Sequence, residues 1–158
     1  MPFPKPDRQN RFFVDHATLI LNSFSVLTGK ALIDSTLSSV EQAQQLFEAP
    51  FVVISHNTEP DPIFTYGNQA ALQLFALTWE ELTQMPSRLS AEPLHQAERQ
   101  RLLATAVKQG YVDDYGGVRV TKIGQRFLVE QATVWNLLDQ TGLFCGQAAM
   151  FSHWIFVD

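Results

Sequence analysis

The stretch that decides the fold is GYVDDYGGVRVTKIGQRFLVEQATVWNLLDQTGLFCGQAAMFSHW, residues 110–154. Turn sequences at residues 123–125 and 139–142 divide it into short runs that are rich in Val, Phe, Tyr and Trp. Such runs are typical of β-strands and are too short for ordinary helices. The last third of the chain therefore predicts an antiparallel meander of three strands, onto which the preceding elements fold.

The composition is that of one globular domain with an extension. The chain has 158 residues, of which 46% are apolar and 17% are charged, so it can bury a core without disulfide bonds or a structural metal. A formal net charge of −5 argues against nucleic-acid binding, and no apolar run approaches the roughly 20 residues of a membrane-spanning helix. One cysteine, Cys145, excludes an internal disulfide, and the first residues lack a signal-peptide pattern. We expect a cytoplasmic protein that contacts neither nucleic acid nor membrane.

The first 49 residues predict a helical extension. Residues 1–10 carry three prolines and are expected to form a flexible or extended lead-in. Apolar residues then recur at helical spacing over residues 11–28 and 36–48, with Asp34 or Ser35 as the cap of the second helix. We expect these helices, residues 11–49, to pack onto the sheet of their own chain; a dimer interface or a docking surface is the alternative.

Residues 50–158 predict the core of the domain. Short strands are expected at residues 51–55 and 63–66, followed by a helix over residues 69–76. Thr78 and Glu81 form a capping box that starts a short helix at Trp79, and Ser90 is the expected cap of a longer helix that ends at Gln109. The buried side of that helix is expected to carry Leu102, Leu103, Ala106 and Val107. Helices inserted between the second and third strands indicate an α+β fold, because a doubly wound sheet alternates strands with helices.

This order of elements resembles that of the PAS domain. YGNQAA (residues 66–71) resembles the PAS segment in which an Asn opens the first helix, and LFALTWEEL (residues 74–82) resembles the pattern that follows it. The chain is more similar still to the MEKHLA domain, a PAS-related family, from about Ser23 to Trp154. The similar phrases are SF and TG within residues 23–29, MPSRLSAE (85–92), GGVR (116–119), RF (126–127), VWN (134–136) and GQAA (146–149).

The resemblance implies a PAS-like five-stranded antiparallel sheet with inserted helices, plus the N-terminal helical extension. The MEKHLA domain is known at the C-terminus of plant class III homeodomain–leucine-zipper proteins and as free-standing proteins of bacteria and cyanobacteria. With neither a homeodomain nor leucine heptads, this chain resembles the free-standing kind. The family implies a sensory or regulatory module that controls association with a partner, not an enzyme.

The sequence argues against the cofactors that PAS relatives carry. Flavin photochemistry requires a thiolate, and Ser87 stands where the flavin-reactive Cys would fall. Gln147 lies one residue out of step with the corresponding Gln, and Arg88 stands at a position that meets a phosphate in flavin-binding relatives, with a surface ion pair as the alternative. His95 is placed like a haem ligand but sits among polar neighbours, and the other histidines show no metal-ligand spacing. We expect no flavin, haem or metal; an unknown small molecule remains open.

Residues of the sheet and the inserted helices supply the candidates for a pocket. Strict alternation places Phe127, Val129, Gln131, Thr133 and Trp135 on one face of their strand. Polar residues on such strands are candidates for hydrogen bonds inside a pocket or an interface, and stabilisation of the sheet is the alternative. Aromatic residues could line an apolar pocket or simply fill the core. The candidate pocket residues are Asn68, Phe75, Trp79, Arg88, Tyr115, Arg119, Gln131, Trp135 and Gln147.

No catalytic constellation stands out. Asp113 and Asp114 are adjacent on a strand and point to opposite faces, so they read as hydrated carboxylates, and Cys145 reads as an inert thiol. The expected function is a non-catalytic sensory or regulatory module that binds a small ligand or a protein partner and forms a homodimer. One alternative is a small enzyme acting on an apolar acid or ester, for which only His153 and Glu130 lie on strands. The other is a purely structural interaction domain whose core leaves no pocket.

Overall fold

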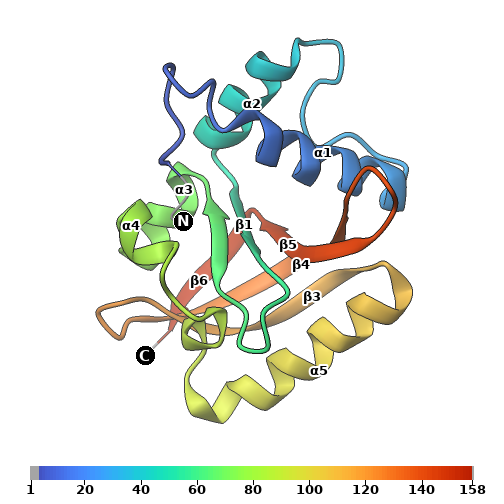
Figure 1. Cartoon of the computed structure of the whole chain (residues 1–158). Coiled ribbons are helices and arrows are strands. Elements are labelled where there is room, and N and C mark those ends of the chain that lie inside the picture. Colours follow the sequence, from blue (N-terminus) through green and yellow to red (C-terminus); the bar gives the residue numbers. More distant parts are fainter. Residues whose placement is uncertain (1–3, 158) are drawn as a thin grey trace.

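An antiparallel sheet separates two helical layers in the computed structural model, which describes residues 4–157 (Figure 1). The strands are β1 (Val52–His56), β2 (Phe64–Gly67), β3 (Tyr111–Val120), β4 (Arg126–Leu138), β5 (Phe144–Phe151) and β6 (His153–Val157). Their order is β2-β1-β5-β4-β3, and β6 pairs with the first part of β4 while β5 pairs with its last part. The expected PAS-like sheet is confirmed. The strand β6 is an addition, which the sequence concealed because only Ser152 separates it from β5.

The helices divide between the two faces of the sheet. α1 (Val14–Thr28) and α2 (Ser39–Glu48) cover one face, and α5 (Pro93–Gln109) lies across the other (Figure 1). α3 (Gln69–Phe75) and α4 (Trp79–Leu82) follow β2, and the 3-10 helix η1 (Ser87–Ser90) leads into α5. We call the side of the sheet that faces α1 and α2 the outer face, and the side that faces α5 the inner face.

Several helix boundaries differ from the expectation, each for a local reason. α1 begins at Val14 because Arg11, Phe12 and Phe13 have left-handed backbone angles. α2 is capped by Ser38 in a capping box with Glu41, since Asp34 bonds instead to Thr36 in a turn. The capping box of Thr78 and Glu81 is confirmed.

The start and the buried side of α5 also differ from the expectation. The Ser90 hydroxyl donates to the carbonyl oxygen of Ser87 at 2.8 Å, so Ser90 does not cap α5; Glu92 precedes the helix and Pro93 opens it. Val107 was expected to be buried but is 46% exposed. In the lead-in, Asp7 and Asn10 exchange side-chain-to-backbone hydrogen bonds, and residues 1–3 lie outside the described residues.

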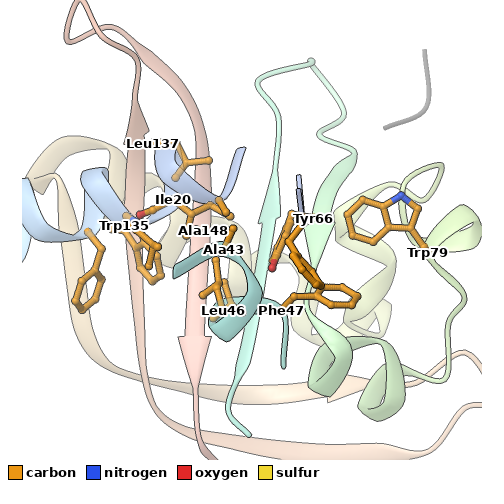
Figure 2. Packing of buried hydrophobic residues seen from close by; sticks show 14 residues of the cluster. Ile20, Ala43, Leu46, Phe47, Tyr66, Trp79, Trp135, Leu137 and Ala148 are labelled. Atoms are coloured by element: carbon orange, nitrogen blue, oxygen red, sulfur yellow. Dashed lines mark hydrogen bonds between the residues drawn. The ribbon is translucent and has the colours of Figure 1, made fainter. Parts of the chain in front are cut away.

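The outer face holds an aromatic core shared by the sheet and the helical extension. Trp135 of β4 packs edge-on against Phe24 of α1 with a centroid separation of 4.9 Å, and its indole N–H donates to the carbonyl oxygen of Ile20. Figure 2 shows Trp135, Ile20 and Ala148 at one end of this cluster and Tyr66 with Trp79 toward the other. The extension therefore packs onto the sheet of its own chain, as expected, and buries its apolar side there.

Paired β-bulges on β3 and β4 decide which side chains face inward. Asp113 and Asp114 of β3 together oppose one residue of β4, and Glu130 and Gln131 of β4 together oppose one residue of β3. Asp114 and Gln131 both have φ of 55°, in the left-handed region. Each bulge shifts the alternation of its strand by one residue. Strict alternation on β4 was therefore a wrong expectation, because Phe127 and Val129 share the inner core with Ala132 and Val134, whereas Trp135 belongs to the outer core.

Asn68 ties the helical extension to the core. Its fully buried side chain accepts hydrogen bonds from the backbone N–H groups of Val53 and Ala71 and donates to the carbonyl oxygens of Leu46 and Phe51. One amide thus caps α3 and joins the end of α2 to β1.

Replacing Asn68 by Ala should remove a hydrogen bond from each of four backbone groups, of which the carbonyl oxygen of Leu46 still accepts from the N–H of Ala49. An unsatisfied buried group costs about 1–3 kcal/mol, so we expect the free energy of unfolding to fall by roughly 3–5 kcal/mol. Urea denaturation followed by circular dichroism measures this fall. Gln69→Ala, at the exposed neighbouring position, is the control, and a comparable small loss in both variants would contradict the role of Asn68.

Replacing Gln131 tests the bulge on β4. Because φ is positive there, Gln131→Gly should keep or raise the free energy of unfolding, while Gln131→Val should lower it by about 1–2 kcal/mol. A regular strand position gives the opposite order, since Val is favoured over Gly in strands. Chemical denaturation of both variants decides between the two.

Candidate ligand-binding site

A cavity of about 60 Å³ lies between the inner face of the sheet and α5. Strands β1 to β5 supply most of its wall, and α3, η1 and α5 supply the rest. Its lining is mainly apolar, with a small number of polar side chains. The lining residues are Ile54, Ser55, His56, Phe64, Phe75, Ser90, Arg99, Leu103, Tyr115, Arg119, Val129, Ala132, Val134, Gln147, Ala148, Ala149 and Phe151.

Arg119 brings a buried positive charge into the cavity wall. Its guanidinium lies over the ring of Tyr115, 5.3 Å from the centroid, and donates to the carbonyl oxygen of Val118 at 2.7 Å. A Cβ atom on Gly117 would lie 2.9 Å from Nη1 of Arg119, so the glycine leaves room for the guanidinium. The pKa of Arg119 is lowered to about 10, mainly by burial and in smaller part by nearby Arg99, while Glu98 opposes this effect. The side chain remains charged at neutral pH.

Arg99 adds a second positive charge from α5. Burial lowers its pKa to about 10 as well, so it too stays protonated. The ion pairs of residues 4–157 are Arg88–Asp61, Lys122–Glu81 and Arg126–Glu92, and none of them includes Arg99 or Arg119. Two guanidinium groups thus share the wall of one cavity without a carboxylate partner in the described part of the chain.

His56 presents an acceptor to the same cavity. Its Nδ1 lies 2.9 Å from the carbonyl oxygen of Asn57, so Nδ1 carries the proton and Nε2 carries a lone pair. Nε2 is buried and has no hydrogen-bond partner within the described residues. Burial lowers the pKa of His56 to about 4, the hydrogen bond to Asn57 raises it and Arg99 lowers it, so the imidazole is neutral at pH 7.

The structure brings only part of the candidate set to the cavity. Phe75, Tyr115, Arg119 and Gln147 line it, and the Gln147 amide donates to the carbonyl oxygen of Leu103 at 3.0 Å. Asn68 is fully committed to backbone groups, as described above. Trp79 and Trp135 lie in the outer core (Figure 2).

The remaining candidates lie at the surface. Arg88 forms a half-exposed ion pair with Asp61 at 3.1 Å, which was the alternative considered for it. Gln131 is exposed at the bulge of β4. Asp113 and Asp114 are exposed, in line with hydrated carboxylates.

Sequence reasoning missed Arg99, His56 and Ser90 in the cavity wall. Arg99 was detectable, because it lies three and four residues before Leu102 and Leu103 and so shares the inward side of α5. His56 follows an apolar run without any motif, and Ser90 was read as a cap, so neither carried a signal of a cavity.

A hydroxyl and an imidazole meet on the outer face. His16 of α1 lies 3.0 Å from the Ser55 hydroxyl, and Ser55 lies 2.8 Å from the Thr65 hydroxyl. Burial lowers the pKa of His16 to about 4. This contact joins α1 to β1 and β2; Ser55 is also part of the cavity wall, whereas His16 and Thr65 are not.

Within residues 4–157, no three His, Cys, Asp or Glu side chains gather as a metal site would require. The helices of this part of the chain are all too short or too polar to span a bilayer.

The sheet and its helices define a PAS-like class of fold. Solved structures with this fold include the PAS domain of a protein from Colwellia psychrerythraea, with a TM-score of 0.62, 13% identity and coverage of 74% of this chain and 94% of that one. The light-state dimer of the fungal blue-light photoreceptor Vivid has a TM-score of 0.57 at 14% identity, with coverage of 83% of this chain and 89% of that chain. These likenesses establish the fold.

The sequence places the chain within a particular family of that class. The profile of the MEKHLA domain matches residues 14–156, so the chain belongs to the MEKHLA family. Homeobox-leucine zipper protein ATHB-14 of Arabidopsis thaliana is 30% identical over 145 residues, which are 87% of this chain and 17% of the relative. HOX32 of Oryza sativa subsp. indica is 26% identical over 146 residues, 89% of this chain and 16% of the relative. The chain thus spans about a sixth of these plant proteins.

The cavity is smaller than the pockets that hold ligands of the size of a flavin. Pockets for ligands of that size enclose roughly 300–1,000 Å³, whereas this one encloses about 60 Å³. Ser87, at the position of the flavin-reactive Cys, is buried in η1 and is not part of the lining.

Stability should fall as the pH drops from about 6.5 to 4. The folded protein resists protonation of His16 and His56, whereas the unfolded chain binds these protons near pH 6.5. The stabilisation is therefore complete above pH 6.5, and at pH 5 each histidine removes at most about 2 kcal/mol. Urea denaturation at pH 7 and pH 5 measures the loss.

His16→Asn should reduce this pH-dependent loss by about half, because one of the two groups is removed. The carboxylates with lowered pKa values, such as Asp34 and Asp139, titrate below this window. His153→Asn, at an exposed position, is the control. An unchanged pH dependence in His16→Asn would contradict the assignment.

Proposed function

We propose that this chain is a non-catalytic sensory or regulatory module in which the inner-face cavity receives a small ligand. The observation that carries the proposal is the buried Nε2 of His56, a residue of the cavity wall; this nitrogen has no partner within the described residues. Buried polar groups are normally paired, so an unpaired one in a cavity wall fits a site that a ligand or ordered water completes. The size of the cavity supports a ligand much smaller than flavin or haem.

The absence of a suitable catalytic pair in the cavity supports a binding role over an enzyme. Burial, with a smaller contribution from nearby Arg99, keeps His56 neutral, and a guanidinium supplies no nucleophile. The hydroxyl and imidazole that do meet are those of Ser55 and His16, and this imidazole is not part of the cavity wall. Membership of a PAS-related family supports the same role, and the single cysteine fits a cytoplasmic protein.

A second copy of the chain is the partner that we propose for signalling. β6 pairs with β4 on one side and with no described strand on the other, and it exposes Ile155 and Phe156. An open strand edge with apolar side chains favours pairing with another chain. The apolar sides of α1 and α2 are already buried against the sheet, so β6 is the better surface for a homodimer.

Small molecules that co-purify with the protein test the receptor role. We expect denatured protein, purified in chloride buffer, to release a small molecule detectable by mass spectrometry. Ala132→Leu should abolish this release because the larger side chain fills the cavity, whereas Ala104→Leu, on the exposed side of α5, should not. Light scattering on the same sample should report a dimer.

Two results would contradict the proposal. Equal release from Ala132→Leu would place the ligand elsewhere. A protein that releases nothing and is stabilised by no compound of a metabolite library would be a structural interaction domain without a receptor site.

A further inference from the structure

We propose that the cavity is a receptor site for a compact carboxylate, held between the guanidinium groups of Arg99 and Arg119. This inference rests on the proposed function and names the chemical class of its ligand.

The positive charges of Arg99 and Arg119 in the cavity wall are not balanced by a carboxylate within residues 4–157. Buried arginines are normally paired, because an isolated charge is costly to remove from water. Arg99 and Arg119 both line the cavity, and neither forms an ion pair with a carboxylate of residues 4–157. Glu98 acts on Arg119 only from beyond ion-pair distance and is itself exposed. The site therefore carries two positive charges that an anion would balance.

The guanidinium of Arg119 is held in a fixed position. The ring of Tyr115, the carbonyl oxygen of Val118 and the missing side chain of Gly117 together seat Arg119 in the wall. The contact with Val118 is its only hydrogen bond within residues 4–157, although a guanidinium has five N–H donors. A planar carboxylate can accept two of them side by side, which is the geometry that arginine recognises best.

The size of the cavity and the polarity of the remaining wall limit which anion can bind. At about 10–15 Å³ for each water, the cavity has room for roughly four to six such positions. Apolar side chains make up much of the wall, among them Ile54, Phe64, Phe75 and Val129. Phosphate would present oxygen atoms to these side chains without partners, whereas a short carboxylate places carbon there.

His56 adds a hydrogen-bond acceptor, its Nε2 atom. Because Nε2 offers a lone pair, it matches a ligand hydroxyl that donates a hydrogen bond. A short hydroxycarboxylate such as glycolate or lactate satisfies both the arginines and His56, while acetate satisfies the arginines alone.

Calorimetry with sodium glycolate, lactate and acetate tests the inference, with glycolamide, sodium chloride and sodium phosphate as comparison solutes. We expect all three carboxylates to bind, the hydroxycarboxylates more tightly, and glycolamide, chloride and phosphate to bind at least about tenfold more weakly than glycolate. Arg99→Gln and Arg119→Gln should each weaken glycolate binding by about tenfold or more. Arg101→Gln, an exposed charge on the same helix, should not change it. His56→Phe should remove the advantage of glycolate over acetate.

Arg99 is less enclosed than Arg119, so Arg99→Gln remains informative if Arg119→Gln fails to fold. Equal binding of glycolate and glycolamide, preference for phosphate, or unchanged glycolate binding in Arg99→Gln would overturn the inference. A neutral molecule that co-purifies and is lost in Ala132→Leu would overturn the carboxylate while leaving the receptor role intact. Absence of any ligand would overturn both.

Discussion

The inner face of this sheet depends on one constraint, the paired bulges of β3 and β4. An extra residue on one strand shifts the pairing register of the two strands by one residue. The bulge on the other strand restores the register within a few residues. Between the bulges the alternation of β4 changes face, so Ala132 and Val134 join Phe127 and Val129 in the inner core. The same change turns Trp135 outward to meet α1. Backbone geometry thus assigns the side chains of β4 to two separate cores, and the cavity lies in the inner one.

The two faces consequently differ in what their polar groups do. On the outer face, His16, Ser55 and Thr65 bond to one another, and Asn68 satisfies backbone groups of three elements. On the inner face, Arg99, Arg119 and His56 keep unused hydrogen-bonding capacity around a cavity. Stability resides in the first set, and the capacity for recognition resides in the second.

The sequence predicted the architecture well because turn residues, capping boxes and the order of elements are local signals. Thr78 with Glu81, Asn68 at the start of α3 and the turn at residues 139–142 each mark a boundary by their own chemistry. The site was predicted only in part, because strict alternation holds until a bulge interrupts it. Of the candidate residues, Arg119 and Gln147 line the cavity, whereas Gln131 lies at a bulge and Trp135 lies in the outer core. Arg88 had no local signal that distinguished a pocket from a surface ion pair.

The central claim is that the inner-face cavity is a receptor site whose positive charges are balanced by a ligand. A crystal structure of the protein grown with glycolate tests it most directly. The account predicts density for a planar group that contacts the guanidinium groups of Arg99 and Arg119, with a hydroxyl at Nε2 of His56. A cavity that holds only ordered water, or an Arg119 side chain turned away from Tyr115 into solvent, would contradict it.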